Sequence, residues 1–216
     1  MCFSAQASFI SAFALLIVFL ATWRSAHTKS LKLLSLTILF FAIQQAGEGI
    51  VWITLMRNDS LSLVHLLAMY SFMFFAGIFW PIWIPAVLYN AEDGPQQKKK
   101  IVPSLIAGSI FAGAFIIAAI KYGLSVSITN NHLQYLIGFP DEPYMKIGYV
   151  VGIAVYAIAV IIPLFVCSII KTWWYGALVA LGFIISALFF YATFGSVWCY
   201  FAAVSSALIY FIIKKH

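Results

Sequence analysis

The fold of this chain is indicated by an apolar segment with a polar centre, FFAIQQAGEGIVWITL, which runs from Phe40 to Leu55. Most of the segment has the composition of a membrane-spanning helix, but its middle carries Gln44, Gln45 and Glu48. An ionisable group inside a span is energetically costly, usually faces the interior of a helical bundle, and marks a site. The segment therefore predicts a membrane protein and the position of a functional site within it.

The composition of the whole chain agrees with this prediction. Of its 216 residues, 64% are hydrophobic and only 8% are charged, whereas soluble proteins carry about 25% charged residues. A transmembrane helix needs roughly 20 apolar residues. Seven runs qualify, at Ala7–Trp23, Leu33–Met56, Leu61–Tyr89, Ile101–Ile120, Ile147–Ile170, Trp173–Tyr191 and Ser196–Ile213. We therefore predict an all-α polytopic transmembrane bundle of seven helices, forming a single domain over residues 1–216.

Basic residues predict the orientation of this bundle, because Lys and Arg collect in cytoplasmic loops. Nine of them lie on one side, in the first, third and fifth connections and the C-terminal tail, whereas the other side carries only Arg57, Lys121 and Lys146. This places the N-terminus outside and the C-terminus in the cytoplasm. Topology and contact with membrane lipid then account for the net charge of +6, so no nucleic-acid partner is expected.

The longest connection, residues 121–146, lies on the predicted outer side. Its middle, SVSITNNHLQYLI, alternates apolar and polar residues around Asn130 and Asn131. This alternation permits a small β-hairpin, and a flexible lid is equally compatible with it. His132 belongs to the same connection and is expected to be solvated.

The third span contains WPIWIP, which runs from Trp80 to Pro85. A proline inside a helix removes a hydrogen bond and kinks the helix. Trp80 and Trp83 lie at the depth of the expected cytoplasmic interface, where indole side chains anchor helices, so we expect an anchoring role for both. No internal repeat is evident, and an inverted-repeat transporter therefore receives no direct support.

Glu48 is the centre of the predicted site. Gln44 lies one turn before it on the same helical face, and Gln45 and Trp52 share a face with it at three- and four-residue spacing. At 1.5 Å per residue, Glu48 lies ~12 Å below the outer surface. In the alternative, structural interpretation, a protonated Glu48 joins helices through hydrogen bonds.

Three more reactive side chains are predicted to lie in the outer third of the bundle. His65 is near the outer start of the third span, Cys199 is near the outer start of the seventh, and Cys2 is at the outer mouth of the first. Ser196 is a good helix N-cap, which would place Cys199 in the first helical turn, where backbone N–H groups favour a thiolate. Together with Glu48 these residues form a candidate pocket.

Several chemistries fit this group. Cys2, Cys199, His65 and Glu48 are a possible ligand set for zinc or copper, although they contain no Cys-x-x-Cys or His-x-x-x-His motif. Cys2 and Cys199 could instead form a disulfide or remain inert thiols. In an enzyme, Cys199 or Cys2 would be the nucleophile, and Glu48 or His65 the acid or base.

Four motifs, in order along the chain, resemble those of a known family. They are MCFSAQASF, QQAGEGIVW, FWPIWIP and GSVWCYFAA, and they are similar to motifs of a mostly bacterial family of uncharacterised multi-spanning membrane proteins. The resemblance covers the chain end to end. It implies an all-helical membrane architecture, groups Cys2, Glu48 and Cys199 as motif residues, and suggests the inner membrane of a bacterium. It implies no activity.

Two other seven-helix classes do not fit. Microbial rhodopsins need a lysine in the last helix, and alkaline-ceramidase-like hydrolases need a histidine pair there. The last span, Ser196–Ile213, contains neither residue type.

We therefore expect an integral membrane protein with an outward-open polar site around Glu48 that binds a small ligand, ion or metal, as in a sensor or a small transporter. The expected ligand-binding residues are Glu48, Gln44, Gln45, His65, Trp52 and Trp198. One alternative is a membrane-embedded enzyme with a cysteine nucleophile that acts on a lipid or thiol substrate. The other is a structural bundle without a ligand.

Overall fold

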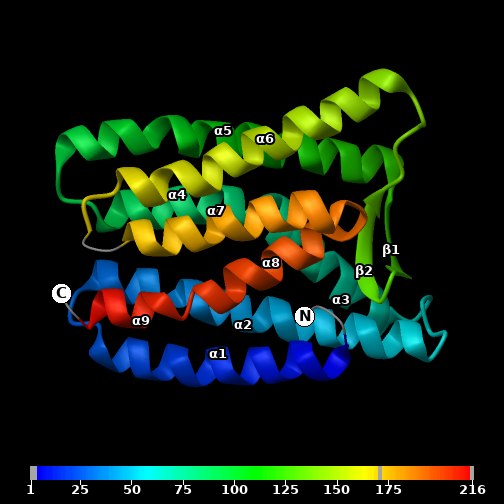
Figure 1. The fold of residues 1–216 in the computed structure, drawn as a ribbon, viewed down its shortest axis with the longest axis horizontal. Helices are drawn as coiled ribbons and strands as arrows, with labels where there is room; N and C mark the ends of the chain where they lie inside the picture. The colour runs from blue at the N-terminus through cyan, green and yellow to red at the C-terminus, as the bar shows by residue number, and fades with distance from the viewer. Residues whose placement is uncertain (1–3, 170–171, 215–216) are drawn as a thin grey trace.

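The computed structural model describes residues 4–169 and 172–214. Within these ranges, seven helical segments are long and apolar enough to cross a membrane, which confirms the predicted all-α bundle of seven spans. The spans lie side by side along one long axis (Figure 1). Their components are α1 (Ala5–Ser25), α2 (Lys29–Met56), α3 (Leu63–Phe74), η1 (Phe75–Phe79), α4 (Trp80–Ala91), α5 (Pro95–Tyr122), α6 (Pro143–Val166), α7 (Thr172–Phe189), η2 (Tyr191–Thr193), α8 (Phe194–Ser205) and α9 (Leu208–Ile213).

Several helices begin earlier than the apolar runs indicated. α2 begins at Lys29, where the side chain of Thr28 caps it by accepting a hydrogen bond from the backbone N–H of Leu31. α5 and α6 begin with Pro95 and Pro143, each in the first turn of its helix. Proline is favoured there because its fixed φ suits a helix and no N–H is needed. Capping residues and prolines that precede the apolar run therefore determine where these helices begin.

A two-stranded antiparallel sheet covers one end of the bundle, which we call the hairpin end (Figure 1). β1 (Leu124–Thr129) pairs with β2 (His132–Ile137), so that Thr129 lies opposite His132. The turn residues Asn130 and Asn131 have φ values of 50° and 60°, as a two-residue type I′ turn requires, and asparagine tolerates this conformation. The hairpin alternative for this connection is confirmed.

The hairpin lies against the helices, and this makes one prediction wrong. His132 is buried, with its ring edge-on to Phe190 at 5.0 Å between ring centroids, whereas the sequence led us to expect a solvated side chain. The neighbouring Leu133 is fully buried in a cluster with Trp52 and Met69. β2 therefore forms a roof over the bundle and is not a free loop.

The third span is continuous but irregular at its centre. η1 is a π-helical segment, in which the N–H of Trp80 donates to the carbonyl of Phe75, five residues earlier. Such a segment inserts an extra residue into the helical repeat and so turns the side chains that follow. Trp80 consequently points into the bundle, where it is 2% exposed and stacks on Phe41 at 3.8 Å between ring centroids. The predicted anchoring role of Trp80 at the membrane interface is therefore wrong.

The largest apolar cluster occupies most of the half of the bundle away from the hairpin and reaches Phe194 and Trp198 on α8. It includes residues near the start of α2, at the end of α4 and on the buried face of α9, among them Leu34, Leu88 and Ile209. This half is therefore densely packed, whereas the half near the hairpin contains the polar residues and the cavity described below.

Close packing of α4 against α5 depends on one glycine. Pro85 has no N–H, so the carbonyl of Pro81 receives no hydrogen bond from the residue four positions later. Gly108 of α5 lies directly against this carbonyl, and a Cβ atom at that position would overlap the oxygen. A hydrogen atom at the glycine Cα leaves the space that the two helices need.

We predict that Gly108→Ala lowers stability, because the added methyl group meets backbone and the helices must separate. Overpacking of this kind costs about 1–3 kcal/mol. Gly113→Ala on the same helix is the matched control, since nothing lies within 4 Å of a Cβ there. The control should be neutral or slightly stabilising. Thermal unfolding followed by circular dichroism in detergent measures both, and equal midpoints would contradict the close approach.

Candidate functional site

Glu48 lies at the centre of a buried polar cluster. Its carboxylate accepts hydrogen bonds from Nε2 of Gln45, at 3.2 Å, and from Oγ of Ser196 on α8. One turn earlier on α2, Oε1 of Gln44 accepts from Nε1 of Trp80 at 2.6 Å. Gln44, Gln45 and Glu48 are all completely buried. The polar centre of the second span thus joins α2 to α8 on one side and to α4 on another.

Cys199 lies next to this cluster, one turn after Ser196. Its side chain is buried. α8 begins at Phe194, so Cys199 is in the second helical turn, and the prediction that placed it in the first turn is wrong. The short helix η2 immediately before α8 moves the helix start two residues upstream of Ser196. Free N–H groups of a first turn are therefore not available to stabilise a thiolate at this position.

The remaining predicted ligand-binding residues lie outside this cluster. His65 is buried, but its Nδ1 is 2.8 Å from Oγ1 of Thr54, nearer the hairpin end of α2. Nε1 of Trp52 is buried without a hydrogen-bond partner. Nε1 of Trp198 donates to the carbonyl of Val179 on α7, at 3.1 Å. The structure therefore groups Glu48, Gln44 and Gln45 but gives the imidazole a separate place.

Metal binding receives no support from this arrangement. Within the described parts of the chain, no three His, Cys, Asp or Glu side chains come together as a possible metal site. Cys199 carries a free thiol, and Cys2 lies outside the described residues. The zinc or copper ligand set of Cys2, Cys199, His65 and Glu48 and the disulfide hypothesis both remain without structural support.

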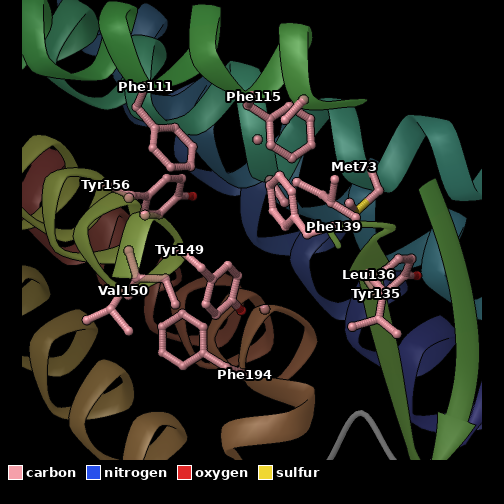
Figure 2. A pocket seen from close by; sticks show the side chains of 18 of the residues that line it. Met73, Phe111, Phe115, Tyr135, Leu136, Phe139, Tyr149, Val150, Tyr156 and Phe194 are labelled. Atoms are coloured by element: carbon pink, nitrogen blue, oxygen red, sulfur yellow. The ribbon is translucent and has the colours of Figure 1, made fainter. Parts of the chain in front are cut away.

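The main feature that the sequence did not reveal is a cavity of about 620 Å³ near the hairpin end. It is bounded by α3 and η1, α5, β2, α6 and α8. Figure 2 shows aromatic rings from several of these elements surrounding the space. They include Phe111 and Phe115 of α5, Tyr149 and Tyr156 of α6, and Phe194 of α8. Because these residues come from distant segments, no local motif could have predicted the cavity.

The opening of the cavity is on the side of the bundle. Tyr149, Val150 and Tyr191 line the cavity and are also between 42% and 65% exposed, which places the rim between the first half of α6 and η2. Tyr135 and Ile137 of β2, together with Phe139 just after the strand, form the wall of the cavity at the hairpin end. Leu136, Pro140 and Asp141 also line the cavity and are exposed, so the rim continues from this flank to the end of β2 and the connection that follows it.

α8 separates the cavity from the polar cluster. Ser196 faces Glu48, whereas Trp198 and Cys199 contribute to the cavity wall, and Glu48 is absent from the lining formed by the described residues. The sequence led us to expect an open site at Glu48 itself. The cavity instead lies beside the Glu48 cluster, and α8 stands between the two.

A second buried acid, Glu92, lies at the opposite end of the bundle. Its carboxylate accepts from the backbone N–H and the Oγ of Ser168, both at 2.6 Å, and from the N–H of Gly94 at 3.0 Å. Burial acts to raise the pKa of Glu92, but the hydrogen bonds from Ser168 and Gly94 outweigh it and hold that pKa below 4.5. Burial also raises the pKa of the neighbouring Cys167 thiol to about 12. Glu92 therefore ties the α4–α5 turn to the α6–α7 connection.

The chain belongs to a family described as a family of unknown function (DUF6629), which matches residues 1–216. This agrees with the expected resemblance to an uncharacterised family that covers the chain end to end. No curated protein and no solved structure matches the chain. Any function has therefore to be argued from the geometry.

We predict that Ser196→Ala destabilises the fold, because one oxygen of a buried carboxyl group loses its donor. Leaving such a group unsatisfied costs about 1–3 kcal/mol. Ser109→Ala is the matched control, since that hydroxyl is exposed on α5 and bonds only within its own helix. The comparison is made by thermal unfolding, and a loss no larger for Ser196→Ala than for Ser109→Ala would contradict the assignment.

We predict that Glu92→Gln lowers stability near neutral pH and weakens the loss of stability in acid. Since the pKa of Glu92 is lower in the folded protein than in the unfolded chain, the ionised group stabilises the fold above about pH 4.5. That contribution disappears as the pH falls through the folded-state pKa. Unfolding midpoints at pH 7 and pH 4 measure the effect, with Asp93→Asn at the exposed neighbouring residue as control. An unchanged pH dependence in Glu92→Gln would refute the prediction.

Proposed function

We propose that this protein binds a small amphipathic molecule with one acyl chain, in the inner membrane of a bacterium and with its hairpin end facing outward. The observation that carries the proposal is the aromatic cavity. Its volume of about 620 Å³ lies within the range of about 300–1,000 Å³ that is typical of small-molecule sites. Its lining is mostly apolar, with the hydroxyl groups of four tyrosines, the hydroxyl of Thr193 and the carboxyl group of Asp141 among its few polar groups.

The side opening supports a ligand that arrives from the membrane. The flank between α6 and η2 opens toward the acyl chains, where the exposed Tyr149 and Tyr191 supply hydroxyl groups, and the exposed Asp141 adds a carboxyl group at the hairpin end of the rim. Tyrosine suits such a position because its ring is apolar and its hydroxyl is polar. An acyl chain in the cavity and a polar head group at the rim match this distribution.

The basic residues support the orientation. Those that flank the spans away from the hairpin include Arg24, Lys29, Lys32 and the run 98–100, and such residues mark the cytoplasmic side. The cavity would then open in the outer half of the membrane.

In this proposal the Glu48 cluster positions α8, and Trp198 and Cys199 contact the ligand. Binding is favoured over catalysis because a thiol nucleophile needs a nearby proton acceptor. The structure places His65 against Thr54, and the carboxylate of Glu48 already accepts from Ser196 and Gln45. Cys199 therefore has no imidazole beside it among the described residues.

Photo-crosslinking tests the proposal. The purified protein in lipid nanodiscs is irradiated with lysophosphatidylcholine that carries a diazirine in its acyl chain, and the labelled peptides are mapped by mass spectrometry. We expect saturable labelling concentrated on the cavity-lining parts of α5, α6 and α8. Labelling spread evenly over all lipid-facing helices would refute the proposal.

Two variants sharpen this test. Ala118→Phe places a ring in the cavity, since Ala118 belongs to its lining, and should reduce saturable labelling at least tenfold. Gly113→Phe adds the same ring on the same helix where no atom lies within 4 Å of a Cβ, and should leave the labelling unchanged. Equal labelling of the two variants would show that the probe binds elsewhere.

A further inference from the structure

A second, smaller void lies next to the cavity and shares part of its lining. Its volume is about 20 Å³, which is enough for about one water molecule. Tyr156, Trp198 and Cys199 line both spaces. We call these three residues the shared layer, because each of them borders both spaces.

The small void is further from the hairpin end than the cavity. The third span, α6 and α8 all run away from the hairpin (Figure 1), and in each of them a residue that lines the void comes after those that line the cavity. Ile84 follows the cavity residues of α3 and η1, Val160 follows Tyr156, and Ala202 follows Cys199. The cavity, the shared layer and the void therefore follow one another along the bundle, in the direction away from the hairpin.

The three spans that line both the cavity and the void have irregular helices. The third span contains the π segment η1 followed by Pro81 and Pro85, and α6 contains Pro163. The seventh span is broken between α8 and α9. Interrupted helices are the points at which membrane spans bend, and they line substrate paths in many transporters. Here the interruptions occur on the same three spans that line both spaces.

The side chain of Trp198 is held in the shared layer by one hydrogen bond and by contacts with aromatic rings. Its Nε1 donates to the carbonyl of Val179, and its ring lies edge-on to Tyr156 and Phe183 at 5.1 and 4.9 Å between ring centroids. Beyond the void, the dense core and the hydrogen bonds of Glu92 close the opposite end. The structure is thus open on one side of the shared layer and closed on the other.

We propose that the protein moves its amphipathic ligand across the membrane, with Tyr156, Trp198 and Cys199 as the gate between an outward-open cavity and a closed inner half. This inference rests on the proposed function, since it takes the ligand of the cavity as the transported molecule. The state described here is the outward-open one. Passage requires Trp198 to leave Val179, and opening of the far side requires the turns joined by Glu92 to separate.

A transport measurement in proteoliposomes tests the inference. The probe is lysophosphatidylcholine with a fluorescent nitrobenzoxadiazole group on its acyl chain, and dithionite added outside destroys only the fluorescence of the outer leaflet. The slow loss of the protected fraction then reports movement across the membrane. We expect a rate at least tenfold above that of protein-free vesicles, a higher rate for Trp198→Ala, and the protein-free rate for Ala118→Phe.

Thiol accessibility tests the gate itself and controls for misfolding. With all three native cysteines replaced by serine, Val179→Cys places a thiol in the small void. Methyl methanethiosulfonate should modify it at least tenfold faster when Trp198→Ala is added. Phe115→Ala, which enlarges only the cavity, should leave the rate unchanged. A thiol at the fully buried Ile38 of α2 should stay unreactive in the Trp198→Ala protein if that protein is folded.

The outcomes separate this inference from the proposed function. Saturable crosslinking in the cavity without transport of the fluorescent probe would overturn the inference and leave the binding function intact. Equal modification of Val179→Cys with and without Trp198→Ala would show that the shared layer is not the barrier. Loss of crosslinking in the cavity would overturn both.

Discussion

The hydrogen bond from Ser196 to Glu48 is the constraint on which the arrangement of the site depends. A carboxyl group in the interior of a membrane protein is stable only when its oxygens are hydrogen-bonded. Gln45 supplies one donor from the same helix, and Ser196 supplies another from α8. This requirement fixes the position of α8 along α2. Trp198 and Cys199, within one turn of Ser196, are then held in the wall of the cavity.

A similar constraint acts on α4. The hydrogen bond between Trp80 and Gln44 requires the indole to point into the bundle, and the π segment before it supplies the rotation. Trp83, almost one turn later, donates to Thr37 of α2 at 3.0 Å. Polar groups on α2 thus set the register of two partner helices. Apolar side chains alone would tolerate sliding, because lipid provides no hydrophobic force that favours one helix contact over another.

The sequence predicts those parts of the structure that depend on local pattern. The lengths of the apolar segments are sufficient to predict the number of spans. Asn130 and Asn131 indicate the position of the hairpin turn. The cost of burying an acid is enough to place Glu48 inside the bundle. The inward position of Trp80 was not predictable, because it depends on one additional residue in a π segment. The cavity depends on side chains from five parts of the chain.

Two other residues show the same limit. Glu92 looks like one acid of a polar turn in the sequence, and only the tertiary approach of Ser168 reveals its role. His65 lies near the end of a span, as expected, but its partner is Thr54. Depth in the membrane can be estimated from residue counts, whereas the direction of a side chain around the helix axis depends on how neighbouring helices are rotated. That rotation decides which reactive groups meet.

The roof of the cavity is made by a single hairpin, and this has an evolutionary consequence. β1 and β2 lie in one uninterrupted connection between α5 and α6, and their hydrogen-bonded register is set by their own two-residue turn. The inner surface of the hairpin is constrained by the helices, because Leu133 packs with Trp52 and Met69 and Tyr135 stacks on Phe72. Substitutions can therefore accumulate at outward positions such as Ser125 and Ser127, whereas the positions that form the cavity wall have to change together with the helices they contact.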